Sequence, residues 1–419
     1  MNRDFRLLWV GETTSQFGSG ITSVAFPLIA AVTLRANTVV VGLLASVAWL
    51  PWLLIGLFAG AWVDRLRRRK IMLACDFASA ALYLSIPVAQ LLGLLTVTQL
   101  VVVALLTGTA TVFFATAYRA YLPALVDKSE LVTGNARLQV GRSSAEVVAP
   151  GASGLIAQFL GLATGLVFDA VSFIVSAVCL LSIRAREPQP PKPVERDSLR
   201  QQIADGVRFV TRDRIMRSFI VYGAVSNLGL MGYQAIQSVF LLREVGVGPG
   251  VIGALLMAGS VGGLIGASLA GRIARRLGTA RAVLCCQLCA VPFGLLLPLT
   301  GRGFGLSLFV GGQFVLTAGI VASNVIYGGF VQGYCPAQLL GRVTASSAVV
   351  NYSTIALGGL LGGVLGETIG TRSTMWVMTV LLTLSVGILL AGPIRRYRDF
   401  PANSATWTPR RTPFRQVLA

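Results

Sequence analysis

The feature that most restricts the fold of this chain is a series of apolar stretches, each long enough to form one membrane-crossing helix. A helix needs about 20 apolar residues to span the ~30 Å hydrocarbon layer of a bilayer. Only 12% of the 419 residues are charged and the mean hydropathy is +0.74, so the chain cannot build a water-soluble exterior. We predict an all-α membrane protein in a lipid bilayer, with twelve transmembrane helices at about 5–32, 39–63, 71–94, 98–121, 143–161, 165–184, 218–242, 250–271, 281–300, 304–332, 343–366 and 373–392.

The basic residues indicate how the chain is oriented. The net charge is +19, which would suggest a nucleic-acid partner in a soluble protein, but in membrane proteins Lys and Arg gather in cytoplasmic loops. Twelve spans place both termini on one side. If that side is the cytoplasm, all but four of the 35 Lys and Arg residues lie there, the exceptions being Arg35, Arg243, Arg302 and Arg372. We therefore predict cytoplasmic termini and no nucleic-acid partner.

Several kinds of chemistry are excluded by missing residues. The chain has no histidine, which removes histidine metal sites, Ser-His-Asp triads and histidine proton relays. It has no GxxxxGK[ST] loop, so ATP is not bound by a P-loop. The six cysteines fall in apolar stretches or predicted cytoplasmic loops, where structural disulfides are not expected. We expect no metal, no cofactor and no enzymatic activity, so any transport has to run on a gradient or a partner.

A charged, proline-rich segment divides the chain into two parts. Apolar residues recur at helical spacing from Leu199 to Val210, which is typical of a helix on the membrane surface or of a solvated linker helix. We predict an N-terminal six-helix bundle at 1–187, a cytoplasmic linker with an amphipathic helix at 188–217, a C-terminal six-helix bundle at 218–394 and a disordered basic tail at 395–419.

The two parts also resemble each other. A glycine followed by basic residues ends the second span at Gly60 and recurs 211 residues later at Gly271. A small-residue pattern in the fifth span, around Pro150, recurs in the eleventh at almost the same offset. Internal repeats of this kind are common in secondary transporters, whose binding site lies between the repeats near the midplane.

These motifs resemble those of one transporter family. Gly60-x-x-x-Asp64-Arg65-x-x-Arg68-Arg69 resembles motif A of the major facilitator superfamily, although Arg67 replaces its usual glycine. Ala149-Pro150-Gly151-x-Ser153-Gly154 resembles the superfamily's antiporter motif. Phe5-Arg-Leu-Leu-Trp9 and Phe168-Asp169-Ala-Val-Ser172-Phe173 resemble the drug-exporting branch that includes macrolide-efflux and enterobactin-exporter-like proteins. The resemblance implies two six-helix bundles, a bacterial inner- or plasma-membrane location, and a monomer that suffices for function.

Motif A suggests a latch between the bundles. Gly60 lies one turn before Asp64, and a glycine lets another helix approach closely. Asp64 could then accept hydrogen bonds from the N-terminus of that helix, which the resemblance implies is the eleventh. Our hypothesis is that Gly60, Asp64, Arg65 and Arg68 form a cytoplasmic gating latch. The alternative is a topology signal that contacts anionic lipid.

Ionisable residues inside the predicted spans are the sharpest functional candidates, because a charge at bilayer depth needs a partner, a cavity or a proton. With no histidine available, a carboxyl group is the natural proton carrier. The proton-coupling candidates, in order, are Glu12, Asp76 and Asp169, although Asp169 could simply cap a helix end. The ion-pair candidates are Arg119, Arg142 and Glu146; the last two are spaced i,i+4.

Together these features predict proton-coupled efflux of an amphipathic small molecule, such as an antibiotic, drug or siderophore, by alternating access. The alternatives are an importer or facilitator on the same fold, and a non-transporting membrane sensor. Aromatic side chains could line an apolar ligand pocket or simply face lipid and other helices; they are Trp49, Trp52, Phe113, Phe114, Tyr118, Tyr233 and Phe240.

Overall fold

A computed structural model describes residues 3–63, 66–125, 131–185, 208, 210–335 and 337–401. These residues form helices and connecting turns, with no strand in the ranges given. The helices are α1 (Arg3–Leu28), η1 (Ile29–Thr33), α2 (Thr38–Val47), α3 (Leu50–Leu54), α4 (Gly56–Val63), α5 (Arg68–Leu91), α6 (Val97–Leu125), α7 (Leu131–Phe159), α8 (Leu162–Ser182), α10 (Arg214–Val239), η2 (Phe240–Val245), α11 (Pro249–Leu277), α12 (Thr279–Ala290), η3 (Val291–Leu296), η4 (Gly303–Gly305), α13 (Leu306–Tyr334), α14 (Ala337–Thr368), α15 (Thr371–Ala391) and η5 (Pro393–Arg396).

Ten of the described helices are long and apolar enough to cross a membrane, which confirms the all-α membrane class. Two of the twelve predicted spans are not among them. The second is divided into α2, α3 and α4, and Pro51, which has no N–H group for the Val47 carbonyl, lies in the first turn of α3. The fifth is α7, which begins at Leu131 and is polar in its first half. Twelve crossings therefore remain a prediction.

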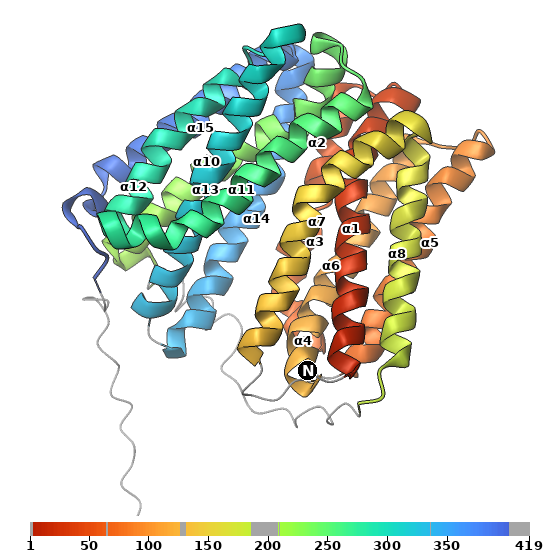
Figure 1. Cartoon of the computed structure of the whole chain (residues 1–419), viewed down its shortest axis with the longest axis horizontal. Coiled ribbons are helices and arrows are strands. Elements are labelled where there is room, and N and C mark those ends of the chain that lie inside the picture. Colours follow the sequence, from red (N-terminus) through yellow and green to blue (C-terminus); the bar gives the residue numbers. More distant parts are fainter. Residues whose placement is uncertain are drawn as a thin grey trace, which may run out of the picture.

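The helices form two halves that lie side by side (Figure 1). In the first half, α1 packs on α7 and α8, and α5 packs on α6 and α8. In the second half, α10 packs on α14 and α15, and α13 packs on α11 and α12. The largest contacts between the halves are α7 with α11 and α2 with α14. The predicted linker at 188–217 lies outside the described residues, apart from 208 and 210–217.

The two halves meet at one end of the molecule and diverge toward the other (Figure 1). We call the end at which α2 and α11 begin the seam end. The opposite end, where α1 begins at Arg3, is called the N-terminal end. The halves are therefore in contact at the seam end and separated at the N-terminal end.

The sequence repeat has a structural counterpart. Helix α5 begins at Arg68 and α12 begins at Thr279, 211 residues later. This is the offset that separates Gly60 from Gly271. Equivalent helices thus begin at equivalent positions in the two halves, as a duplicated unit requires.

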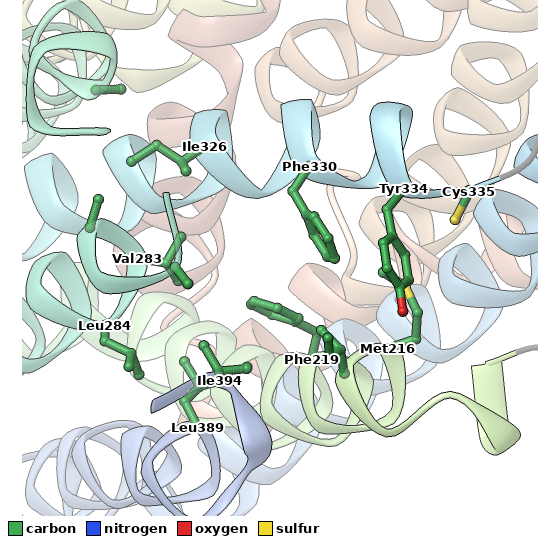
Figure 2. Packing of buried hydrophobic residues seen from close by; sticks show 14 of the residues in the cluster. Met216, Phe219, Val283, Leu284, Ile326, Phe330, Tyr334, Cys335, Leu389 and Ile394 are labelled. Carbon is green, nitrogen blue, oxygen red and sulfur yellow. The ribbon is translucent and has the colours of Figure 1, made fainter. Parts of the chain in front are cut away.

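The second half has a core of aromatic side chains at the N-terminal end of the molecule. Phe219 of α10 and Phe330 of α13 point toward each other within a buried cluster that also includes Tyr334 (Figure 2). The Tyr334 hydroxyl donates a 2.6 Å hydrogen bond to Asp213, which also caps the N-terminus of α10. The cluster therefore holds together the ends of several helices.

Residues 393–401, which we call the C-terminal strap, fold back on this core. Asp399 Oδ1 accepts a 2.8 Å hydrogen bond from the Thr279 N–H at the start of α12, and the Arg398 carbonyl accepts from Ala280 and Arg281. The Phe400 ring lies 4.2 Å from that of Phe330 between centroids. The tail predicted to begin at residue 395 therefore begins no earlier than residue 402, because its first residues cap a helix and bury an aromatic ring. Residues 402–419 lie outside the described residues.

Replacing Phe400 by Ala should lower the free energy of unfolding by about 2 kcal/mol, less than a fully buried aromatic because Phe400 is only half-buried. Thermal unfolding of the purified protein in detergent measures the effect. Phe304→Ala is the matched control, since Phe304 is 93% exposed. Equal melting temperatures for the two variants would show that the strap contributes nothing to the stability of the second half.

Candidate functional site

A cavity of about 500 Å³ lies between the two halves. The first half contributes α1, α2, α3, α5 and α6 to its wall, and the second half contributes α10 and α14. The lining is mostly apolar, with hydroxyl and amide groups from Ser19, Thr22, Ser23, Thr107, Thr111, Gln234 and Gln237. This size and composition suit a drug-sized ligand.

Two tryptophans and a tyrosine meet across the halves beside the cavity. Trp49 and Trp52 line it from the first half. Tyr352 of α14 stacks on both rings, with centroids 5.9 Å from Trp49 and 5.2 Å from Trp52. Of the aromatics listed from the sequence, Trp49 and Trp52 line this cavity, whereas Tyr233 and Phe240 are buried in the second half. Phe113 lines a separate apolar groove with Trp62.

The helix that carries the tryptophans is interrupted at the level of the cavity. The N–H of Trp52 donates to the Trp49 carbonyl instead of the Ala48 carbonyl, and Pro51 has no N–H to offer Val47. Carbonyl groups are therefore released from the helical pattern beside the lining residue Ala48. Interrupted helices at a cavity between repeats are typical of substrate sites in transporters.

The seam end is closed by contacts of backbone on backbone. A Cβ atom on Gly42 of α2 would lie 2.6 Å from the Gly359 carbonyl oxygen and from the Gly363 Cα of α14. On the other side, a Cβ on Gly253 of α11 would lie 2.5 Å from the Pro150 carbonyl oxygen of α7. Only glycine permits such close crossings. We call this close packing of α2 on α14 and of α7 on α11 the seal at the seam end.

The antiporter-like motif lies within this seal. Gly154 faces the start of α11, where its Cβ would lie 2.8 Å from the Pro249 carbonyl oxygen, and Gly151 faces Met257. Pro150 supplies the carbonyl that approaches Gly253. The structure thus brings the predicted residues Pro150, Gly151 and Gly154 together at the boundary between the halves.

Two charged side chains reach across the same boundary to helix ends. Glu367 at the end of α14 accepts a 2.9 Å hydrogen bond from the N–H of Thr38, the first residue of α2. Arg243 of η2 donates a 2.7 Å hydrogen bond to the Ala36 carbonyl, just after η1. A carboxylate at a helix N-terminus and a cation beside carbonyls at a helix C-terminus both have favourable charge. These contacts support the closed seam.

Asp169 lies in α8 with its side chain fully buried. Its Oδ1 accepts a 3.3 Å hydrogen bond from Ser172, while no described residue donates to Oδ2. A Cβ on Gly18 of α1 would lie 2.5 Å from this carboxyl, so the glycine makes room for it. Asp169 is well inside α8, about two turns beyond its start, and not at the outer end of the helix as the alternative interpretation had it.

Asp76 and Glu12 lie together nearer the N-terminal end. Asp76 of α5 is 1% exposed, and no described residue donates a hydrogen bond to either carboxyl oxygen. Glu12 of α1 accepts a 2.8 Å hydrogen bond from Gln16 and contributes, with Ser176, to a small internal pocket. All three predicted carboxyl candidates are therefore in the first half, around α1.

The other predicted residues lie away from this group. Arg142 Nε is 2.9 Å from Glu146 Oε1 in an exposed i,i+4 ion pair. Arg119 is exposed and acts electrostatically on Tyr352. In the predicted latch, a Cβ atom on Gly60 would meet no described atom within 4 Å, and Arg68 begins α5. Asp64 and Arg65 lie outside the described residues.

Three features of the site were missed from the sequence. Gly42 belongs to no small-residue motif in its apolar span, and Tyr352 is a single tyrosine in a small-residue helix, so neither carried a signal. Glu367 could have been noticed as a charge at a span end, since helix ends attract such side chains. Arg243 was noted only as a basic residue outside the cytoplasm. The partners of both lie more than 200 residues away.

Two helical halves that enclose an apolar cavity, with a discontinuous helix in its wall, define a secondary transporter. Residues 1–413 match the family described as transmembrane secretion effector, within the major facilitator superfamily. The chain belongs to this family and is a multi-pass membrane protein of the bacterial plasma membrane. The predicted resemblance to drug-exporting members is therefore confirmed.

Comparisons with known proteins agree with this assignment. The multidrug efflux pump Tap of Mycolicibacterium fortuitum is 28% identical over 403 residues, which are 93% of this chain and 94% of the relative. A mutant of the nucleoside transporter NupG superposes with a TM-score of 0.79 at 12% identity, covering 93% of this chain and 99% of NupG.

A third comparison bears on the conformation. A bacterial homologue of the iron transporter ferroportin superposes with a TM-score of 0.76 in its inward-facing state, at 16% identity and covering 93% of this chain and 98% of the homologue. Its outward-facing state gives 0.62, at 17% identity and covering 93% and 99%. Of these two structures of the homologue, the inward-facing one therefore superposes more closely on this chain.

Proposed function

We propose that this chain is a proton-coupled exporter of amphipathic small molecules that works by alternating access. In this proposal the chain crosses the membrane twelve times, acts as a monomer, and has both termini and the N-terminal end of the molecule in the cytoplasm. The observation that carries the proposal is the cavity between the halves, sealed at one end by glycine contacts of α2 with α14 and of α7 with α11. Breaking this seal while closing the N-terminal end would expose the cavity to the other side.

Motif A fits the step of this cycle in which the N-terminal end of the molecule closes. When the halves close at the N-terminal end, the open space beside Gly60 would receive the start of α14, and Asp64 would accept hydrogen bonds from its N–H groups. Arg65 and Arg68 would flank the contact. The latch would therefore form only in the outward-facing state, which is consistent with the open space that a Gly60 Cβ atom would face in the present one.

The buried carboxyl groups of the first half support proton coupling. Glu12, Asp76 and Asp169 are the acidic residues that the described structure places inside the first half's helix packing. A charge at this depth is costly, so such groups mark proton or substrate pathways in membrane proteins. The close relation to a pump named for multidrug efflux supports export as the direction.

Accumulation of antibiotics and dyes in an efflux-deficient bacterium tests the proposal. Cells expressing the wild type should accumulate at least one compound several-fold less than cells with an empty vector, and a protonophore should remove the difference. Asp64→Asn should also remove it without loss of folded protein, because the latch loses its charge.

Four results would contradict parts of this proposal. Higher accumulation than the empty vector would indicate import. Lower accumulation that survives the protonophore would exclude proton coupling. Normal efflux by the Asp64→Asn variant would exclude the latch, and no change for any compound would favour a non-transporting sensor.

A further inference from the structure

The first helix of each half ends in the same unusual way at the seam end. Helix α1 continues into the π-helix η1, which begins at Ile29, and α10 continues into the π-helix η2, which begins at Phe240, 211 residues later. This is the offset of the sequence repeat. π-Helical turns are rare and often occur at functional sites. The duplicated unit therefore carries one unusual helix end in both of its copies.

Each π-helix is followed by a residue in the left-handed conformation. In the second half this residue is Gly246, with φ 73°, and in the first half it is Arg35, with φ 50°. In both turns the N–H of the next residue donates to a carbonyl six residues earlier. Glycine adopts this conformation freely, whereas a residue with a side chain does so at a cost in free energy. Among the described residues other than glycine, Arg35 alone has a positive φ, so the strain lies in the turn of the first half.

The strained turn is contacted from across the seam. Arg243 of η2 donates hydrogen bonds of 2.7 Å to the Ala36 carbonyl and of 3.4 Å to the Ala31 carbonyl, on either side of Arg35. Just beyond the turn, Glu367 of α14 accepts the hydrogen bond from the start of α2. A cation and an anion of the second half therefore stabilise one short segment of the first half.

The relaxed turn is instead contacted from within its own half. Arg302 Nε donates a 2.9 Å hydrogen bond to the Val245 carbonyl, just before Gly246. The strained residue thus occupies the turn that the opposite half stabilises. A strained conformation persists only where its surroundings enforce it, and contacts across the seam exist only while the seam is closed. Separation of the halves at this end would therefore release the strain at Arg35.

We propose that residues 31–38, which we call the catch, hold the seam end closed against stored backbone strain. Arg243 and Glu367 stabilise the strained turn while the halves are in contact, and Arg35 leaves the left-handed region when they separate. The released strain offsets part of the cost of breaking the contacts, so the seam can be closed firmly and still open. The inference rests on the alternating access proposed above and names the residues that set how readily the seam opens.

The distance between two spin labels at the seam end measures this opening. Leu94 lies between α5 and α6 of the first half and Phe304 lies just before α13 of the second, and they are 68% and 93% exposed. Cysteines at these positions, in the full-length chain with its six native cysteines replaced by alanine, carry the labels. Double electron–electron resonance in nanodiscs gives the ratio of separated to closed seams, without substrate or a proton gradient. The melting temperature shows that each variant is folded.

Loss of a contact across the seam should favour its opening. Arg243→Met should raise the ratio at least about tenfold, because hydrogen bonds from a charged group are lost. Glu367→Met should raise it as well, because the start of α2 loses its carboxylate. Arg302→Met is the matched control. It removes a cation that donates to a carbonyl at the same end but within one half, and it should leave the ratio unchanged.

A second pair of variants separates the strain at Arg35 from its charge. Added to Arg243→Met, the substitution Arg35→Gly should lower the ratio several-fold, back toward the wild type, because glycine adopts the turn without strain. Added to the same variant, Arg35→Gln should not lower it, because glutamine removes the charge and keeps the strain.

Three outcomes would overturn the inference. An unchanged ratio in Arg243→Met would exclude the catch. An equal rise in Arg302→Met would show a general loosening of the seam end in place of a specific contact. Equal effects of glycine and glutamine at position 35 would exclude stored strain. The ratio is measured without transport, so a seam that opens as expected in a protein that exports no compound would contradict the proposed function alone.

Discussion

Replacing Gly42 by Val is expected to lower the efflux rate at least about tenfold, because even its first side-chain carbon collides with the backbone of α14. That carbon would lie 2.6 Å from Gly359 O and from Gly363 Cα, and neither is a flexible side chain that could move aside. The halves would then be unable to meet at the seam end. The protein should remain folded yet be trapped with this end open.

Gly387→Val is the matched control for this result. Gly387 is also a glycine within a long apolar helix, α15, but a Cβ there meets no atom within 4 Å. Both substitutions introduce the same β-branched residue, so a general loss of helix propensity would affect them equally. The measurement is the initial efflux rate, normalised to the folded protein recovered in membranes. Equal rates for the two variants would show that the seam does not have to close during transport.

Replacing Asp76 by Asn is expected to abolish gradient-driven transport while leaving the melting temperature unchanged or higher. The Asp76 carboxyl is 1% exposed and has no described hydrogen-bond donor, so its ionised form carries a desolvation cost of several kcal/mol. Asparagine has the same shape without a charge. A residue kept only for stability would show the opposite pattern, with a lower melting temperature.

Proteoliposomes separate coupling from movement of the substrate. The Asp76→Asn variant should no longer concentrate substrate when a proton gradient is imposed, but it should still exchange labelled for unlabelled substrate across the membrane, since exchange needs no net proton step. Glu146→Gln, at the exposed ion pair with Arg142, should behave as the wild type in both assays. Concentrative transport by Asp76→Asn would remove Asp76 from the coupling mechanism and leave Glu12 and Asp169 as candidates.

The positions of the helices were largely predictable because each long span carries its own apolar signal. The exceptions have identifiable causes. Pro51 was visible in the sequence, but a proline inside a span can kink a helix or divide it, and only the surrounding packing decides. Helix α7 begins well before the predicted span because polar residues such as Asn135, Arg137 and Arg142 lower the hydropathy without ending the helix.

The candidate site was predictable in its residue types and not in its pairings. Buried acids stand out in an apolar sequence, so Asp76 and Asp169 could be named in advance. That Gly18 makes room for Asp169, or that Glu367 caps α2, depends on contacts between residues far apart in the chain. A single sequence contains no record of such contacts, whereas the repeat at Gly60 and Gly271 was visible because both copies share it.

The backbone seal at the seam end also determines at which point of the transport path the membrane voltage drops. If the N-terminal end faces the cytoplasm, the cavity shares the potential of the cell interior, and the thin layer of glycine contacts sustains the voltage. Moving one positive charge outward against 100 mV then costs about 2.3 kcal/mol. Exchange of a monovalent cation for one proton would be insensitive to the membrane potential, whereas exchange for two protons would be driven by it. The stoichiometry of coupling would therefore be readable from how the transport rate responds to voltage.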